Sequence, residues 1–256
     1  MNGQPMKRLG IVGGLGPETS CKFCLAINNK FRDKTSCQPD IVLENLPVSL
    51  DAEQKIVSGE LSSEMQSLLI RAVRSLNKAG ADMIVIPCNT VHVFIDILRK
   101  ESQAPILSII EECAAECEKQ SFRKVGLLAS TTTVNSCLHS RELGKRRIEV
   151  VLPEDRDQRA ISSIILKIIH GTAGKEDKKI LKRIIREMAE NCAQAVILGC
   201  TDLPLFITEK ESVLPLISTT AILEDATVRE LCILPDCCPT TPLTHGTLAS
   251  ADSNAK

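Results

Sequence analysis

The chain has 256 residues, of which 43% are hydrophobic and 25% charged, and its net charge is −1. This balance gives no broad electrostatic field for nucleic acid or an anionic membrane, and the absence of Trp and Tyr removes most side chains that stack on bases. The apolar run near the N-terminus is too short for a signal peptide, and no stretch approaches a membrane span. We therefore expect a cytoplasmic protein that binds neither nucleic acid nor membranes and whose cysteines are mostly reduced.

Short runs rich in β-forming residues alternate with longer helical patterns along almost the whole chain. The expected strands are Leu9–Val12, Ile41–Glu44, Met83–Ile86, Ile106–Leu107, Val125–Leu128, Glu149–Leu152, Ala195–Leu198 and Leu216–Ile217. The expected helices are Glu18–Phe31, Glu64–Lys78, Val91–Lys100, Glu111–Lys119, Val134–Leu143, Arg156–His170, Glu176–Glu190 and Ala221–Leu231. Such alternation is typical of parallel sheets with helices on both faces.

The chain resembles itself at three places that follow one another in the same order. Ordered matches at similar spacing indicate two homologous halves. The matching pairs are KRLGIVGG (Lys7–Gly14) with RKVGLLAS (Arg123–Ser130), ADMIVIPCNT (Ala81–Thr90) with AQAVILGCTD (Ala193–Asp202), and PILSII (Pro105–Ile110) with PLISTT (Pro215–Thr220).

The repeat predicts an α/β fold of two similar Rossmann-like halves, related by a pseudo-twofold axis with the site between them. We expect the first half to comprise residues 1–114 together with about 209–235, and the second to comprise residues 115–208. Residues 236–256 are rich in Pro, Thr, Ser and Ala, so we expect a flexible tail.

One cysteine of the repeat follows a strand in each half. Cys88 comes after the strand Met83–Ile86, and Cys200 comes after Ala195–Leu198. Ligands of parallel α/β sheets bind beyond the carboxyl ends of the strands, so packing of the halves would place the two thiols on opposite walls of one cleft. Inverting the α-carbon of an amino acid needs proton removal on one face and return on the other, which a thiolate and a thiol can perform.

The turns around the cysteines carry groups suited to an anionic substrate. Both thiols precede helix N-termini, whose backbone N–H groups lower thiol pKa and can hold a carboxylate. Asn89, Thr90 and Thr201 add side-chain donors at the same turns. His92 is equally consistent with tuning of Cys88 or with a structural role. Nothing in the sequence requires pyridoxal phosphate or another cofactor.

The glycines after the first strand give a second candidate binding turn. Gly14 and Gly16 lie where a dinucleotide loop would begin, but Thr19 replaces the third glycine of that fingerprint. A tight turn whose backbone approaches a small carboxylate is the better interpretation. Cys21 and Cys24 form a C-x-x-C pair that lacks a second pair of ligands, so helix packing is favoured over a metal or redox module.

Four segments together resemble the aspartate/glutamate racemase family, in its aspartate racemase branch. They are LGIVGGLGPE (Leu9–Glu18), IPCNTVH (Ile86–His92), LLASTTTV (Leu127–Val134) and ILGCTDLPL (Ile197–Leu205), within a resemblance that covers roughly residues 7–232. The resemblance implies a homodimer without cofactor or metal and a small amino-acid substrate. It also implies catalytic Cys88 and Cys200 and substrate contacts from Asn89, Thr90, Thr131, Thr133 and Thr201.

Departures from the family pattern leave the substrate open. The family's arginine-bearing Pro-Asp-Arg segment corresponds to LPVSLDAEQK (Leu46–Lys55), which has no arginine, while a second basic residue corresponds to Arg159. Asp202 stands where glutamate is common, so its role in orienting Cys200 needs a different geometry. The sequence predicts an aspartate/glutamate-type racemase; the alternatives are a hydantoin racemase, a maleate isomerase, or a non-catalytic protein that binds a small dicarboxylate.

Overall fold

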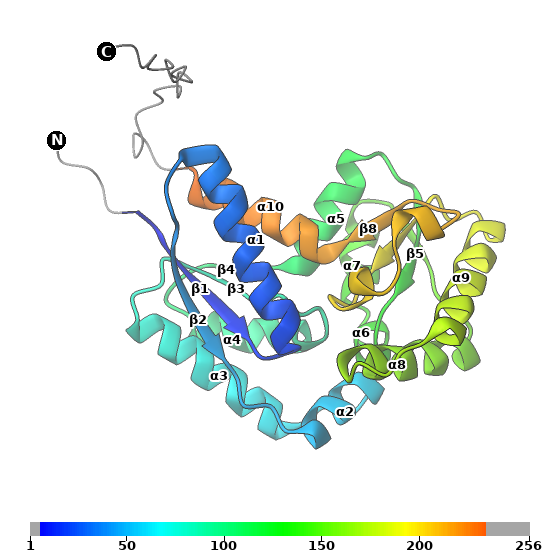
Figure 1. Cartoon of the computed structure of the whole chain (residues 1–256), viewed down its shortest axis with the longest axis horizontal. Coiled ribbons are helices and arrows are strands. Elements are labelled where there is room, and N and C mark those ends of the chain that lie inside the picture. The colour runs from blue at the N-terminus through cyan, green and yellow to red at the C-terminus, as the bar shows by residue number, and fades with distance from the viewer. Residues whose placement is uncertain (1–5, 234–256) are drawn as a thin grey trace, which may run out of the picture.

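Two four-stranded parallel sheets form the framework of the computed structural model, which describes residues 6–233 (Figure 1). The predicted flexible tail, 236–256, lies outside the described residues. The first sheet has the order β2-β1-β3-β4 and the second the order β6-β5-β7-β8. The strands are β1 Arg8–Gly13, β2 Asp40–Asn45, β3 Met83–Val85, β4 Ile106–Leu107, β5 Lys124–Leu128, β6 Glu149–Val151, β7 Ala195–Leu198 and β8 Leu216–Ser218.

Helices cover both sheets and connect their strands (Figure 1). The α-helices are α1 Pro17–Thr35, α2 Leu50–Ser58, α3 Ser63–Lys78, α4 Ile95–Glu101, α5 Ile109–Lys119, α6 Thr131–Asn135, α7 Leu138–Lys145, α8 Asp155–Ile169, α9 Lys175–Glu190 and α10 Thr219–Leu231. The 3₁₀ turns are η1 Thr90–Phe94, η2 Leu203–Leu205 and η3 Glu209–Glu211. All eight predicted strands are confirmed within a residue or two.

Two predicted helices differ from the structure, and one helix was not predicted. The stretch Val91–Lys100 begins as the 3₁₀ turn η1 before it becomes α4, and Val134–Leu143 is split between α6 and α7 because Cys137 adopts a left-handed φ of 55°. Helix α2 was not predicted, although Ser49 caps it by accepting a hydrogen bond from the backbone N–H of Ala52 at 3.2 Å.

The two sheets repeat one strand order, which confirms the two similar α/β halves that the internal repeat predicts. The segment expected to rejoin the first half divides between them: β8 pairs with β7 in the second sheet, whereas α10 packs against α1 and α5. The strand belongs to the second sheet because it continues the ladder beyond β7, just as β4 continues the ladder beyond β3. We propose that the second half extends to Ser218, at the end of β8, and that α10 after it belongs to the first half.

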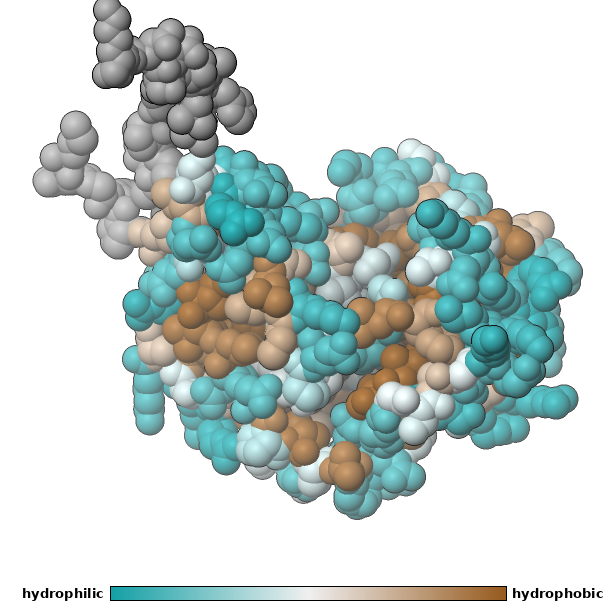
Figure 2. Space-filling model, viewed as in Figure 1, coloured by the Kyte–Doolittle hydropathy of each residue, from teal (hydrophilic) through white to brown (hydrophobic). Residues whose placement is uncertain are grey.

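The core consists of three apolar clusters, and the largest of them contains residues of both halves. Helix α3 illustrates its construction, because Met65, Leu69, Val73 and Leu76 recur at helical spacing and are all fully buried. Each such side chain stabilises the fold by roughly 1.5–3 kcal/mol relative to exposure. Figure 2 shows a largely hydrophilic outer surface, with apolar patches beside α1 and along the hollow between the two lobes. Within residues 6–233, no helix combines the length and the apolar character needed to cross a membrane.

Candidate active site

One cavity lies between the halves and is lined by the turns that follow β3 and β7. Its volume is about 40 Å³. Helices α2 and α8 supply apolar walls, including Ile56 and Ile165. The cavity is lined by seven of the predicted site residues: Gly16, Cys88, Asn89, Thr90, Cys200, Thr201 and Asp202.

Cys88 lies at the cavity wall immediately before η1. Burial raises the pKa of its thiol to about 11, although the backbone N–H groups of Thr90 and Val91 and the nearby charge of Asp202 also act on it. The two N–H groups lower the pKa, as the turn predicts, and the carboxylate raises it. The expectation of a lowered thiol pKa is therefore wrong, because desolvation of the thiolate outweighs the effect of the backbone N–H groups.

Cys200 is buried and belongs to a chain of contacts that ends at Thr19. Its Sγ donates a hydrogen bond to Oδ2 of Asp202 at 3.7 Å, and Oδ1 of Asp202 accepts one from the hydroxyl of Thr19. Burial raises the pKa of Asp202, and burial together with the charge of Asp202 raises the pKa of Cys200. Asp202 is thus placed to receive the proton of the Cys200 thiol, while Thr19 from α1 fixes the direction of its carboxylate.

Of the two glycines predicted for the binding turn, only Gly16 borders the cavity. A Cβ atom added to Gly16, whose φ is 69°, would lie 3.1 Å from Oδ1 of Asp202. Gly14 instead allows two chain segments to meet, since a Cβ atom there would lie 2.5 Å from the carbonyl oxygen of Leu46. The N–H of Gly14 donates to the hydroxyl of Ser20, so it is occupied within the turn itself.

The side chain of Asn89 is fixed by residues of the second half and of α10. Its Nδ2 donates to Oγ1 of Thr219 at 2.9 Å, and its Oδ1 lies 3.0 Å from Nε2 of His139. Since the oxygen can only accept, Nε2 of His139 is the donor. Burial lowers the pKa of His139 to about 3, so the ring is neutral. Asn89 therefore holds the Cys88 turn in place through its oxygen and one of its two amide N–H groups.

Three hydroxyl groups tie the same turn to the second half. Oγ1 of Thr90 lies 2.9 Å from Oγ of Ser130 and accepts from Oγ1 of Thr133 at 3.2 Å. Thr133 is therefore one residue removed from the cavity. Thr131 contacts Ser162 of α8 at 2.8 Å through its hydroxyl and is likewise not among the described residues that line the cavity.

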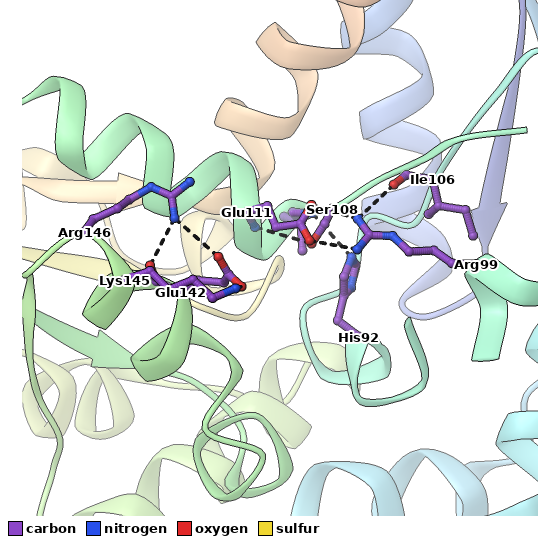
Figure 3. A network of polar contacts seen from close by, with 9 residues as sticks. His92, Arg99, Ile106, Ser108, Glu111, Glu142, Lys145 and Arg146 are labelled. Carbon is purple, nitrogen blue, oxygen red and sulfur yellow. Dashed lines mark hydrogen bonds and ion pairs between the residues drawn. The ribbon is translucent and has the colours of Figure 1, made fainter. Parts of the chain in front are cut away.

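His92 lies behind the Cys88 turn rather than in the cavity. Its Nδ1 is 2.8 Å from the carbonyl oxygen of Cys88, and its Nε2 accepts from the backbone N–H of Ile109, which begins α5. Burial lowers the pKa of the ring to about 4, so the neutral ring donates through Nδ1. Figure 3 shows this ring beside the ion pair between Arg99 and Glu111, which joins α4 to α5 through two hydrogen bonds of 2.8 Å.

The charges at the cavity differ from those expected of a dicarboxylate site. Arg159 is exposed on α8, and among residues 6–233 no lysine, arginine or histidine lines the cavity. Glu53 of α2 lines it instead, as a carboxylate that accepts from Nε2 of His170 at 3.2 Å. Cys21 lies exposed on α1 and Cys24 half-buried, and the described part of the chain holds no group of three or more potential metal ligands.

Sequence reasoning missed three residues that shape this site: Thr19, Glu53 and His139. Thr19 was noticed only as the residue that breaks the dinucleotide fingerprint, and Glu53 falls in the helix that was not predicted. His139 lies on α7, about fifty residues after Asn89 in the chain, and no sequence motif predicts the hydrogen bond between them. A capping pattern at Ser49 was the available signal for α2.

Comparisons with known proteins agree with this geometry. Residues 12–227 match the family model Asp/Glu/Hydantoin racemase. The broad specificity amino-acid racemase RacX of Bacillus subtilis (strain 168) is 26% identical over 86% of this chain and 96% of its own length. An aspartate racemase homologue from Pyrococcus horikoshii OT3 superposes with a TM-score of 0.70 and 28% identity, over 88% of this chain and 99% of that one. The aspartate racemase of Picrophilus torridus has a TM-score of 0.71 and 25% identity, over 88% and 94%. The chain therefore belongs to the Asp/Glu/hydantoin racemase family and is an isomerase of that family.

Proposed function

We propose that the protein is a cofactor-independent amino-acid racemase in which Cys88 and Cys200 transfer the protons. The observation that carries the proposal is that one cavity is lined by both thiols, one from each half of the molecule. A substrate whose α-carbon lies between them can lose a proton to one sulfur and gain a proton from the other. This two-base arrangement needs no swinging side chain.

The proposed reaction conserves both protons and electrons. The thiolate of one cysteine removes the α-proton, and the electron pair of the C–H bond moves into the substrate carboxylate, forming an enediolate. The thiol of the other cysteine then returns a proton to the opposite face of the α-carbon. The backbone N–H groups of Thr90 and Val91, which lower the pKa of Cys88, can also stabilise the growing negative charge.

Formation of the reactive thiolate is linked to substrate binding. Burial raises the pKa of both thiols above its ordinary value, so both are protonated near neutral pH. The α-ammonium group of a substrate brings a positive charge that favours the thiolate. Asp202 accepts the hydrogen bond from Cys200 and can take its proton when that residue acts as the base.

The relatives support an amino acid as the substrate. RacX is named a broad specificity amino-acid racemase, and the protein from Picrophilus torridus is named an aspartate racemase. Both names describe inversion at an amino-acid α-carbon, which is the reaction that the paired thiols can perform.

The test is incorporation of solvent deuterium at Cα together with chiral chromatography, using a panel of amino acids and purified protein without added cofactor. Cys88→Ala and Cys200→Ala should each abolish racemisation. Cys21→Ala, which removes an exposed thiol on α1, should leave it unchanged. Racemisation that persists at the wild-type rate in either cavity variant would refute the two-thiol assignment.

A further inference from the structure

Two carboxylates face the cavity, and they stand in different surroundings. Asp202 is committed to Thr19 and Cys200 and lies beside the reacting sulfur. Glu53 lies on α2, where its side chain is 15% exposed, and its described partner is the half-exposed ring of His170. Because Asp202 is the carboxylate that is hydrogen-bonded to a sulfur, we assign the α-ammonium group of a substrate to Asp202 and the side chain of the substrate to the part of the cavity lined by Glu53.

The walls next to Glu53 are aliphatic. Ile56 and Val57 follow it on α2, and Ile165 and Ile169 face the cavity from α8. Such walls accommodate the methylene groups of an amino-acid side chain, since apolar contact is favourable there and no polar partner is needed. A side-chain carboxylate would find Glu53 in this space and no lysine, arginine or histidine among the described lining residues.

We propose that Glu53 determines the charge preference of the site, so that it accepts amino acids with aliphatic side chains that are neutral or end in a cation and rejects those that end in a carboxylate. The inference rests on the proposed racemase function and specifies its substrate class. A like charge about 5 Å away in a partly buried site, at an effective dielectric constant of ~20, disfavours binding by at least about a hundredfold. The binding of a substrate with a cation at the same distance from Glu53 is strengthened by a comparable factor.

Ratios between substrates test the proposal, because a merely structural change at Glu53 would alter all substrates together. For the wild type we expect kcat/KM to be highest for L-lysine or L-methionine and at least about tenfold lower for L-glutamate. Glu53→Gln should raise the glutamate-to-methionine ratio and lower the lysine-to-methionine ratio, each by about tenfold or more. Glu53→Asp keeps the charge and should preserve both preferences, and Glu60→Gln, an exposed acid beyond α2, is the control.

Calorimetric binding of the same three amino acids separates this proposal from the proposed reaction. If the protein binds lysine and methionine more tightly than glutamate, and Glu53→Gln reduces that difference by about tenfold or more, the preference holds even where no α-deuterium exchange is seen. Binding with this preference but without exchange would refute the proposed racemisation and would support the role of Glu53 in specificity. Racemisation that favours glutamate or aspartate in the wild type, or ratios that do not move in Glu53→Gln, would overturn the role of Glu53.

Discussion

Replacing Asp202 by Asn should move two properties of Cys200 in opposite directions. The substitution keeps the size of the side chain but removes the charge that lies 3.7 Å from the sulfur. The carboxylate both repels a thiolate at Cys200 and accepts a hydrogen bond from the neutral thiol, and both effects raise the pKa of the thiol. Without them the thiolate forms more readily, yet the group that can take the thiol proton during turnover is lost.

The size of the effect follows from the distance. Two unit charges 3.7 Å apart repel each other by about 4 kcal/mol at an effective dielectric constant of ~20. Because Asn can still hydrogen-bond to the sulfur, we expect only part of this energy, enough to raise the alkylation rate of Cys200 by iodoacetamide at pH 8 at least about tenfold. Racemisation should fall by about a hundredfold or more, since general acid–base assistance is worth that much.

Mass spectrometry of the Cys200 peptide measures the alkylation separately from that of the other thiols. Asp51→Asn is the matched control, because Asp51 is exposed on α2 and pairs with Lys55 away from the cavity, so neither rate should change. Slower alkylation of Cys200 in Asp202→Asn would refute the electrostatic reasoning. Racemisation at the wild-type rate would refute the role of Asp202 as the proton acceptor.

Three further perturbations test the framework of the site. Gly16→Ala should lower racemisation and destabilise the fold by about 1–2 kcal/mol, because φ is 69° and the new methyl group meets Asp202, whereas Gly144→Ala, in open space on α7, should be neutral or slightly stabilising in urea unfolding. Asn89→Leu and His139→Phe each leave a buried partner unsatisfied, so the double variant should cost about 1–3 kcal/mol less than the sum of the single variants; additivity within about 0.5 kcal/mol would contradict the hydrogen bond between them. The pKa values of His92 and His139, about 4 and about 3, lie below the ordinary value near 6.5, so between these limits the unfolded chain binds protons that the folded chain does not. Stability should therefore fall as the pH drops below about 6.5, by about 1.4 kcal/mol per pH unit for each ring, and His139→Phe should halve that slope.

The strands and the division into two halves could be predicted from the sequence, because each strand is a local apolar run and the halves repeat one another. Strands such as Ala195–Leu198 are short, wholly apolar runs, so their positions are set locally. Helix α2 was missed because its nine residues include the exposed Asp51, Gln54 and Lys55 and bury only three apolar residues. Its stability depends on packing against α6 and α8, which are distant in the chain.

The candidate site was predictable where it follows strand ends and not where it depends on packing. Cys88 and Cys200 line one cavity because the carboxyl ends of β3 and β7 face it. The sequence could not reveal that the amide of Asn89 is occupied by His139 and Thr219, because those contacts come from separate helices. Nor could it reveal the raised thiol pKa values, since desolvation depends on how tightly the halves enclose the sulfur atoms.

The hydroxyl cluster of Thr90, Ser130 and Thr133 bears on how a substrate enters. The cavity has a volume of about 40 Å³, so we expect it to widen when an amino acid enters. The cluster holds the Cys88 turn against the start of α6 through hydrogen bonds of 2.9 and 3.2 Å, so this contact resists separation. We expect this widening to be a rotation about the cluster, in which α2 moves away from α8. Such a motion would open the cavity for exchange of substrate and product while the Cys88 turn stays attached to the second half.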